Sequence, residues 1–199
     1  PLIIKVASIP SARMQVYFLD NEEYFQRKYV FTDKDGKFYA DNDERMIFFC
    51  KGAIETVKKL GWSPDIRHCH GWMSALVPVY LKTTYKDDPT FKHSKVVYSV
   101  YENDFDGKLD AEFAQKAIMN DMSEAHTGLF KEGTNNALHA GAVKYADGIV
   151  LGSPDIDPEV LNNVKNSHKS VLEYDYTVDF ENYYNFYDEI TNEELVHVA

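Results

Sequence analysis

Two histidines, separated by one residue, lie where a predicted strand at residues 65–69 ends and a helix begins. Alternation along a strand puts the side chains of His68 and His70 on the same face. Ligands of open α/β sheets bind outside the carboxyl ends of the strands, so a ligand site is expected here. Three roles are open: a ligand contact, a structural hydrogen bond, or a metal-chelating His-x-His pair, which needs a third ligand that the nearby sequence lacks.

A second polar cluster stands at the start of the strongest predicted helix, where Asp41, Asn42, Asp43, Glu44 and Arg45 follow one another. Asp41 is expected to cap this helix, and Glu44 three residues later completes a start that resembles a capping box. The unpaired backbone N–H groups of a first helical turn also suit the binding of sugar hydroxyls. Capping with a surface ion pair is the alternative.

The elements that must position these clusters follow from hydrophobic periodicity. Strands at residues 2–8 and 14–19 open the chain, followed by a short helix at 21–26 with Asp20 as its cap and an aromatic hairpin at 29–39. Helices and strands then alternate, which predicts an α/β fold with a Rossmann-like, doubly wound, mostly parallel sheet and helices on both faces. The helices are expected at 41–60, 72–85, 109–119, 135–145 and 158–167, and the strands at 65–69, 95–101, 147–151 and 170–172.

The last segment, residues 173–199, is acidic and aromatic, with apolar residues at near-helical spacing from Phe180 to Ile190. An amphipathic helix that docks on the domain is one interpretation, and a surface on which glucan stacks is the other. We expect two units: a Rossmann-like domain over residues 1–172 and a C-terminal helix within 173–199 that packs back on it.

Composition excludes several classes of function. The net charge of −11 repels phosphate backbones and anionic lipids, so neither nucleic acid nor a membrane is an expected partner. No apolar run reaches the ~18 residues of a membrane span. No two of the 10 glycines are adjacent or two apart, which excludes a G-x-G phosphate loop. The two cysteines, Cys50 and Cys69, suggest no disulfide framework and fit a reducing cytoplasm.

Several segments between residues 13 and 155 together resemble glycosyltransferase family five, the bacterial glycogen and starch synthases. Residues 16–27 resemble the family's "vyfidneeyFgR", residues 39–49 its "yPDNaeRfaff", residues 62–72 its "WrPDivHaHDWq" and residues 145–154 its "YAD…vSP". The run ALVPVYLK at residues 75–82 matches the family residue for residue. The combination is specific, although no single piece would be.

The resemblance implies the N-terminal half of a GT-B fold, in which two Rossmann-like domains face a cleft. It implies glucosyl transfer from ADP- or UDP-glucose to an α-1,4-glucan, with glucan and part of the donor sugar on this domain and no metal or other cofactor. The transition state of such a transfer resembles an oxocarbenium ion and needs nearby hydrogen-bond donors and carboxylates. By the resemblance the catalytic residues are His70 and Asp41, and the substrate-binding residues are Asp20, Asn21, Tyr24, Asn42, Arg45, His68 and Trp72.

The departures from the family pattern leave two hypotheses. The opening Lys-x-Gly-Gly-Leu loop is missing, so an N-terminally truncated domain is expected, and 199 residues cannot also hold the nucleotide-binding domain. The family's His-Asp-Trp is His70-Gly71-Trp72, and the polar residue after it is Met73. In the first hypothesis the chain is the acceptor-side domain of a glycosyltransferase, and a homo-oligomer or a partner protein supplies the donor domain. In the second it is a non-catalytic relative that binds glucan or has a regulatory role. An unrelated small-molecule enzyme on a flavodoxin-like sheet is disfavoured, because the chain has no glycine-rich loop.

Overall fold

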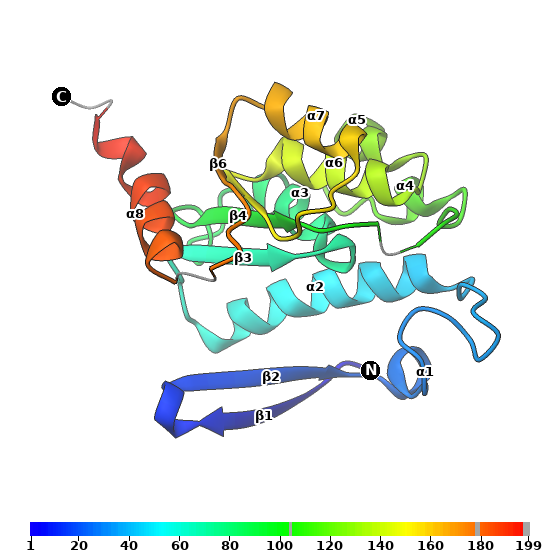
Figure 1. Ribbon diagram of the computed structural model, residues 1–199. Coiled ribbons are helices and arrows are strands. Elements are labelled where there is room, and N and C mark those ends of the chain that lie inside the picture. The colour runs from blue at the N-terminus through cyan, green and yellow to red at the C-terminus, as the bar shows by residue number, and fades with distance from the viewer. Residues whose placement is uncertain (104, 178–179, 197–199) are drawn as a thin grey trace.

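A four-stranded, fully parallel sheet forms the centre of the protein (Figure 1). The computed structural model describes residues 1–103, 105–177 and 180–196, with side chains up to residue 192. The strands lie in chain order: β3 (Ile66–His70), β4 (Lys95–Val100), β5 (Gly148–Leu151) and β6 (Ser170–Leu172). The predicted Rossmann-like α/β fold with a mostly parallel sheet is confirmed.

Helices cover both faces of this sheet. Neighbouring parallel strands in chain order are joined by right-handed crossovers, which return on the same face. The helices in those connections, together with the long helix before β3, form the main core against Val96, Tyr98 and Ile149. They are α2 (Asn42–Leu60), α3 (Leu76–Lys82), α6 (Asn135–Tyr145) and α7 (Pro158–Asn166). The other face carries α8 (Phe180–Val196), as Figure 1 shows.

The contact between α8 and the sheet is a second, smaller core. Phe186 and Ile190, which are 5% and 0% exposed, pack against Val97 and Val150. The helix approaches β5 at Gly148, where a methyl group would overlap the Ile190 side chain. Alternation along β4 therefore sends Val96 and Tyr98 into the main core and Val97 into the α8 core. Residues 178–179 and 197–199 of the predicted C-terminal unit lie outside the described residues.

The first two strands form an antiparallel hairpin of their own, apart from the parallel sheet. They are β1 (Ile3–Ile9) and β2 (Met14–Asp20), joined by the 3₁₀ turn η1 (Pro10–Ala12). The hairpin lies beside α2 at Gly52, where an added Cβ would be 3.4 Å from Leu2 and 3.5 Å from Leu19. A glycine there lets the hairpin approach the helix closely.

Asp20 does not cap the short helix that follows, contrary to prediction. It is the last residue of β2 and pairs with Lys5 across the hairpin. The cap of α1 (Glu22–Phe25) is Asn21, whose side chain accepts a hydrogen bond from the Tyr24 N–H at 3.0 Å. The strand runs one residue further than predicted, which moves the cap by one position.

Three other predicted elements are shorter or divided. The aromatic hairpin at 29–39 is reduced to one antiparallel bridge, Thr32 with Phe38. The helix at 109–119 is only α4 (Phe113–Lys116), and the Leu109 N–H before it donates to the Gly133 carbonyl. The helix at 72–85 is divided into the 3₁₀ turn η2 (Trp72–Ser74) and α3, whose first turn accommodates Pro78 without losing a hydrogen bond.

Two short elements complete the connection to α6: α5 (Glu124–Thr127) and the 3₁₀ turn η3 (Gly128–Phe130). Among the described residues, no helix has the length and apolar character needed to cross a membrane.

The packing of α8 predicts that Ile190→Ala destabilises the protein. Removing a fully buried isoleucine side chain leaves a cavity, and we expect a loss of about 2–4 kcal/mol in the free energy of unfolding. Urea unfolding measures the loss, and hydrogen exchange should show it first in α8. Tyr184→Ala on the same helix removes a side chain that is 71% exposed and should change stability by less than ~0.5 kcal/mol. Equal losses in the two variants would contradict this packing.

Candidate functional site at the carboxyl end of the sheet

His68 and His70 lie stacked on the face of β3 that α8 covers. Their ring centroids are 4.0 Å apart and their planes differ by 27°. His70 is the exposed member of the pair, and its Nδ1 is 2.8 Å from the Tyr101 hydroxyl. Desolvation of the packed side of the His70 ring lowers its pKa. Its Nε2 has no protein partner among the described residues and stays open to a ligand.

His68 uses both of its ring nitrogens within the protein. Its Nδ1 lies 2.6 Å from the Tyr187 hydroxyl of α8, and its Nε2 lies 2.7 Å from the Ser99 Oγ of β4. Burial, with the neighbouring charge of His70 as a smaller cause, lowers the pKa of His68 to about 3. The ring is therefore neutral at pH 7. This arrangement makes His68 a support for His70, and its predicted contact with substrate stays a prediction.

Tyr101 extends from the end of β4 and reaches His70 across a gap that Gly152 leaves open. A Cβ at Gly152 would lie 2.5 Å from the Tyr101 ring, whereas one at Gly71 would make an ordinary contact at 3.8 Å. Gly71 adopts a φ of +68°, a backbone conformation that side chains other than hydrogen disfavour. The carboxyl-end rule could have identified Tyr101 as a site residue, since it follows the neighbouring strand at the same edge. No local pattern marks Tyr187 as the distant partner of His68.

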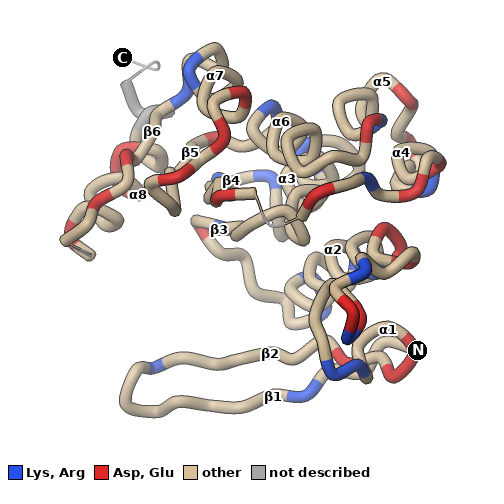
Figure 2. Tube along the Cα trace, turned by 45° about the vertical axis from the view of Figure 1, so that its right-hand side comes forward, with Lys and Arg blue, Asp and Glu red and all other residues tan. Residues whose placement is uncertain are grey.

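Asp41 does not cap α2 with its side chain, although it occupies the N-cap position. Its two carboxylate oxygens accept hydrogen bonds from Arg27, at 2.8 and 2.5 Å. This contact lowers the pKa of Asp41 and raises that of Arg27. Figure 2 shows the resulting mixture of acidic and basic segments between α1 and the start of α2. The predicted capping box is wrong, because the ion pair with Arg27 takes the carboxylate that a cap requires.

Asn42 and Arg45 point inward and hold the segment between α1 and α2. The Arg45 guanidinium donates to the Tyr24 carbonyl at 2.9 Å, to the Val30 carbonyl at 2.7 Å and to Asn42 Oδ1 at 2.5 Å. Asn42 donates to the Phe31 carbonyl at 2.8 Å. Both side chains are buried, with 3% and 1% of the surface exposed for Arg45 and Asn42. Their structural hydrogen bonds leave little capacity for sugar hydroxyls.

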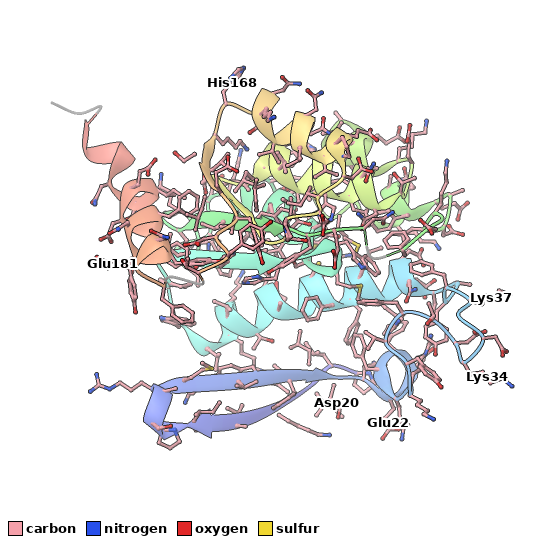
Figure 3. All side chains as sticks on the ribbon, in the orientation of Figure 1. Asp20, Glu22, Lys34, Lys37, His168 and Glu181 are labelled. Atoms are coloured by element: carbon pink, nitrogen blue, oxygen red, sulfur yellow. The ribbon has the colours of Figure 1, made fainter. Side chains whose placement is uncertain are left out.

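The other predicted site residues near α1 also have protein partners. Asn21 caps α1 and donates to the Pro1 carbonyl at 3.0 Å, and the Tyr24 hydroxyl donates to Glu44 at 3.2 Å. The labelled Asp20 of Figure 3 lies beside α1, far from the end of β3. The described residues show no hydrogen bond or ion pair that joins this group to the histidines.

Trp72 connects the two groups through packing. It is 1% exposed, and its ring lies 4.8 Å from Phe31, 6.0 Å from Phe38 and 4.9 Å from Phe105. The segment between α1 and α2 is thereby anchored next to the residue that follows His70 and Gly71. Trp72 supports the site through this buried aromatic packing. Its predicted contact with substrate stays a prediction.

The described part of the chain holds no cluster of three His, Cys, Asp or Glu side chains arranged for a metal ion. What the carboxyl end of β3 and β4 offers is a neutral histidine pair with one open imidazole nitrogen. Such a nitrogen can donate or accept a hydrogen bond with a neutral hydroxyl or with a charge that develops on oxygen.

Comparison with known families identifies a match over most of the chain. The family of the starch synthase catalytic domain matches residues 2–174. A glycogen synthase of Chlorobium limicola is 38% identical over 169 residues, which are 84% of this chain and 34% of that protein. A glycogen synthase of Pelodictyon phaeoclathratiforme is 39% identical over 163 residues, or 81% of this chain and 33% of that protein. The chain thus spans about a third of the length of these relatives.

Among solved structures, the catalytic domain of starch synthase IV from Arabidopsis thaliana, bound to ADP and acarbose, has the same fold. The TM-score is 0.65 at 15% sequence identity, over 86% of this chain and 36% of that one. At this identity the likeness supports the fold alone, and it agrees with one half of a GT-B architecture.

The hydrogen bonds of Arg45 predict that even Arg45→Lys destabilises the protein. An ammonium cannot reproduce the planar guanidinium contacts, so two buried acceptors lose their donor, at a cost of roughly 2–4 kcal/mol. Urea unfolding measures this cost. Arg13→Lys, at the exposed turn between β1 and β2, is the matched control and should leave stability within ~0.5 kcal/mol. An unchanged stability in Arg45→Lys would show that the guanidinium contacts do not hold this segment.

The buried histidines predict a loss of stability in mild acid. The pKa of His68 is lowered to about 3 and that of buried His139 to about 4, below the value of ~6.5 in an unfolded chain. Between these values the unfolded chain binds more protons. The stabilisation is therefore complete above about pH 6.5 and declines as the pH falls.

We expect each of these histidines to remove roughly 2 kcal/mol of stability between pH 7 and pH 5. Urea unfolding at the two pH values measures the loss. The loss of stability between the two pH values should be smaller in His139→Asn. It should be undiminished in His168→Asn, because His168 is exposed. The same pH dependence in all three proteins would exclude His139 as a source.

Proposed function

The chain belongs to the starch synthase catalytic domain family, and on that premise we propose that it is the acceptor-side domain of a glucosyltransferase. The reaction is transfer of glucose from ADP- or UDP-glucose to an α-1,4-glucan. In this proposal the chain holds the glucan and part of the donor sugar. Glycogen synthases that are 38% and 39% identical to it support the choice of substrates.

The open imidazole of His70 carries this proposal. It stands at the carboxyl end of a parallel sheet, where ligands of open α/β folds bind. His70 is neutral and held by Tyr101, so its Nε2 can hydrogen-bond a sugar hydroxyl or an oxygen that gains charge in the transition state. We assign His70 the role nearest the chemistry, and Asp41 a role through Arg27. The acidic surface suits a neutral glucan better than a polyanion.

We propose that the donor site for the nucleotide sugar is completed by a second copy of the chain, which builds it jointly with the first, or by a partner protein. Within the chain we propose a division into a domain over residues 1–172 and a C-terminal unit within 173–199 that contains α8. The two free, buried cysteines, Cys50 and Cys69, support assignment to a reducing cytoplasm.

A non-catalytic glucan-binding role is the second candidate. It is favoured by the internal hydrogen bonds of Asn42 and Arg45, which occupy groups that the resemblance assigns to substrate. Met73 at the position of a polar family residue points the same way. The two candidates share a glucan site at His70 and differ in whether the nucleotide sugar also binds.

Calorimetric titration of the full chain with maltooligosaccharide, ADP-glucose and UDP-glucose separates these candidates. Glucan binding that weakens about tenfold in His70→Ala, the loss of one hydrogen bond to a polar ligand in a desolvated site, supports the shared site. Binding of a nucleotide sugar as well favours the transferase, and glucan binding alone favours the second candidate.

His168→Ala is the matched control for this titration. His168 is exposed between α7 and β6, and Figure 3 shows it projecting away from β3. It should bind glucan like the unchanged protein. Absence of glucan binding, or equal losses in the two variants, would refute the proposed site.

A further inference from the structure

Two tyrosine–histidine hydrogen bonds lie next to each other at the site. The Tyr187 hydroxyl of α8 is 2.6 Å from His68 Nδ1, and His68 Nε2 is 2.7 Å from Ser99 Oγ. The Tyr101 hydroxyl is 2.8 Å from His70 Nδ1, and the two imidazoles are stacked. These contacts bring α8, β3 and β4 together at the site.

Each tyrosine–histidine contact has two possible arrangements. A neutral imidazole has one N–H donor and one acceptor nitrogen, so the donor in each contact fixes which ring nitrogen carries the proton. In the outward arrangement Tyr187 donates to His68, and Tyr101 donates to His70, which then carries its proton on Nε2. In the inward arrangement both imidazoles donate to the tyrosines, and the open Nε2 of His70 is an acceptor.

The acidity of the groups selects the outward arrangement. A phenol loses its proton near pH 10, far more readily than a neutral imidazole N–H, and an imidazole nitrogen binds a proton far more readily than a phenol oxygen. Both tyrosine–histidine contacts are therefore stronger with tyrosine as the donor. Successive bonds in one direction also polarise one another, which adds to the preference.

We propose that Tyr101 is a positioning residue that holds His70 with its proton on Nε2, so that His70 presents a hydrogen-bond donor to an oxygen of the glucan. His68 is held by Tyr187 and Ser99 and stacks on His70, so α8 also contributes to the site. The identity of the ligand rests on the proposed function, whereas the position of the proton on the His70 imidazole does not.

The surroundings keep these two contacts in place. Ser99 is 1% exposed, and the Tyr101 ring lies directly against Gly152, where an added Cβ would be 2.5 Å away. Burial lowers the pKa of His68 to about 3, so that its Nδ1 remains an acceptor throughout the neutral range. His68 also stacks on His70 at 4.0 Å, which restricts rotation of the exposed ring.

The test is the protonation state of the imidazoles in the full chain, read from long-range ¹H–¹⁵N correlation spectra of uniformly ¹⁵N-labelled protein at pH 7.5. We expect His68 and His70 to carry their protons on Nε2. A proton on Nδ1 of His70 in the unchanged protein would overturn the proposal, and this measurement needs no variant.

Tyr101→Phe tests the positioning role. It removes the donor to His70 Nδ1, so a population with the proton on Nδ1 should appear, and the affinity for maltooligosaccharide should fall about threefold to tenfold. The control is Tyr183→Phe, which deletes a hydroxyl from α8 beside His68, with ring centroids 6.2 Å apart. It should change neither reading. An unchanged His70 spectrum in Tyr101→Phe would show that Tyr101 does not fix the proton.

Tyr187→Phe tests the direction of the hydrogen bond at His68, the ring that stacks on His70. In the outward arrangement the variant leaves only an unpaired lone pair on His68 Nδ1, and His68 keeps its proton on Nε2. In the inward arrangement it would leave a buried N–H without an acceptor, and the proton would move from Nδ1 to Nε2. A proton that moves in this variant contradicts the proposal.

The two proposals can fail separately. If the unchanged protein binds no maltooligosaccharide while His70 carries its proton on Nε2, the proposed function fails and the positioning role of Tyr101 stands. If glucan binds while His70 carries its proton on Nδ1, the reverse holds.

Discussion

The parallel pairing of β3 with β4 in a single register is the constraint on which the rest of the structure depends. It places His68 opposite Val97 and His70 opposite Ser99. Because side chains alternate along a strand, a shift by one residue would turn both histidines toward the main core. The register is fixed from both sides, by Val96 and Tyr98 in the main core and by Val97 beneath α8. The geometry of the site is thus a consequence of how the sheet is packed.

The same packing explains why the polar residues near α1 serve a different purpose from the histidines. Arg45 and Asn42 lie at the start of α2 but turn inward, because the segment between α1 and α2 has few backbone hydrogen bonds of its own. That segment then covers Trp72, which follows His70 and Gly71. The buried Arg45 guanidinium and the buried Trp72 indole support the site, and the ring nitrogen that is open to a ligand belongs to His70.

The alternation of helices and strands was sufficient to predict the parallel sheet, its strands and the helices that cover both faces. The histidine pair at a strand end could also be predicted, because that argument uses only strand alternation and sheet polarity. The roles of Asp20 and Asp41 could not be predicted. Each carboxylate pairs with a basic side chain, Lys5 or Arg27, that the folded structure brings to it, and the carboxylate then does not cap a helix. The contact of Tyr187 with His68 spans 119 positions, and nothing local in the sequence marks it.

The central claim is that a glucan binds at the open nitrogen of His70. The most direct measurement is the ¹H–¹⁵N spectrum of the histidine side chains with and without maltooligosaccharide. The structure predicts that the Nε2 signal of His70 shifts on titration, while that of exposed His168 stays in place. A shift confined to other histidines, or a spectrum that glucan leaves unchanged, would contradict the claim.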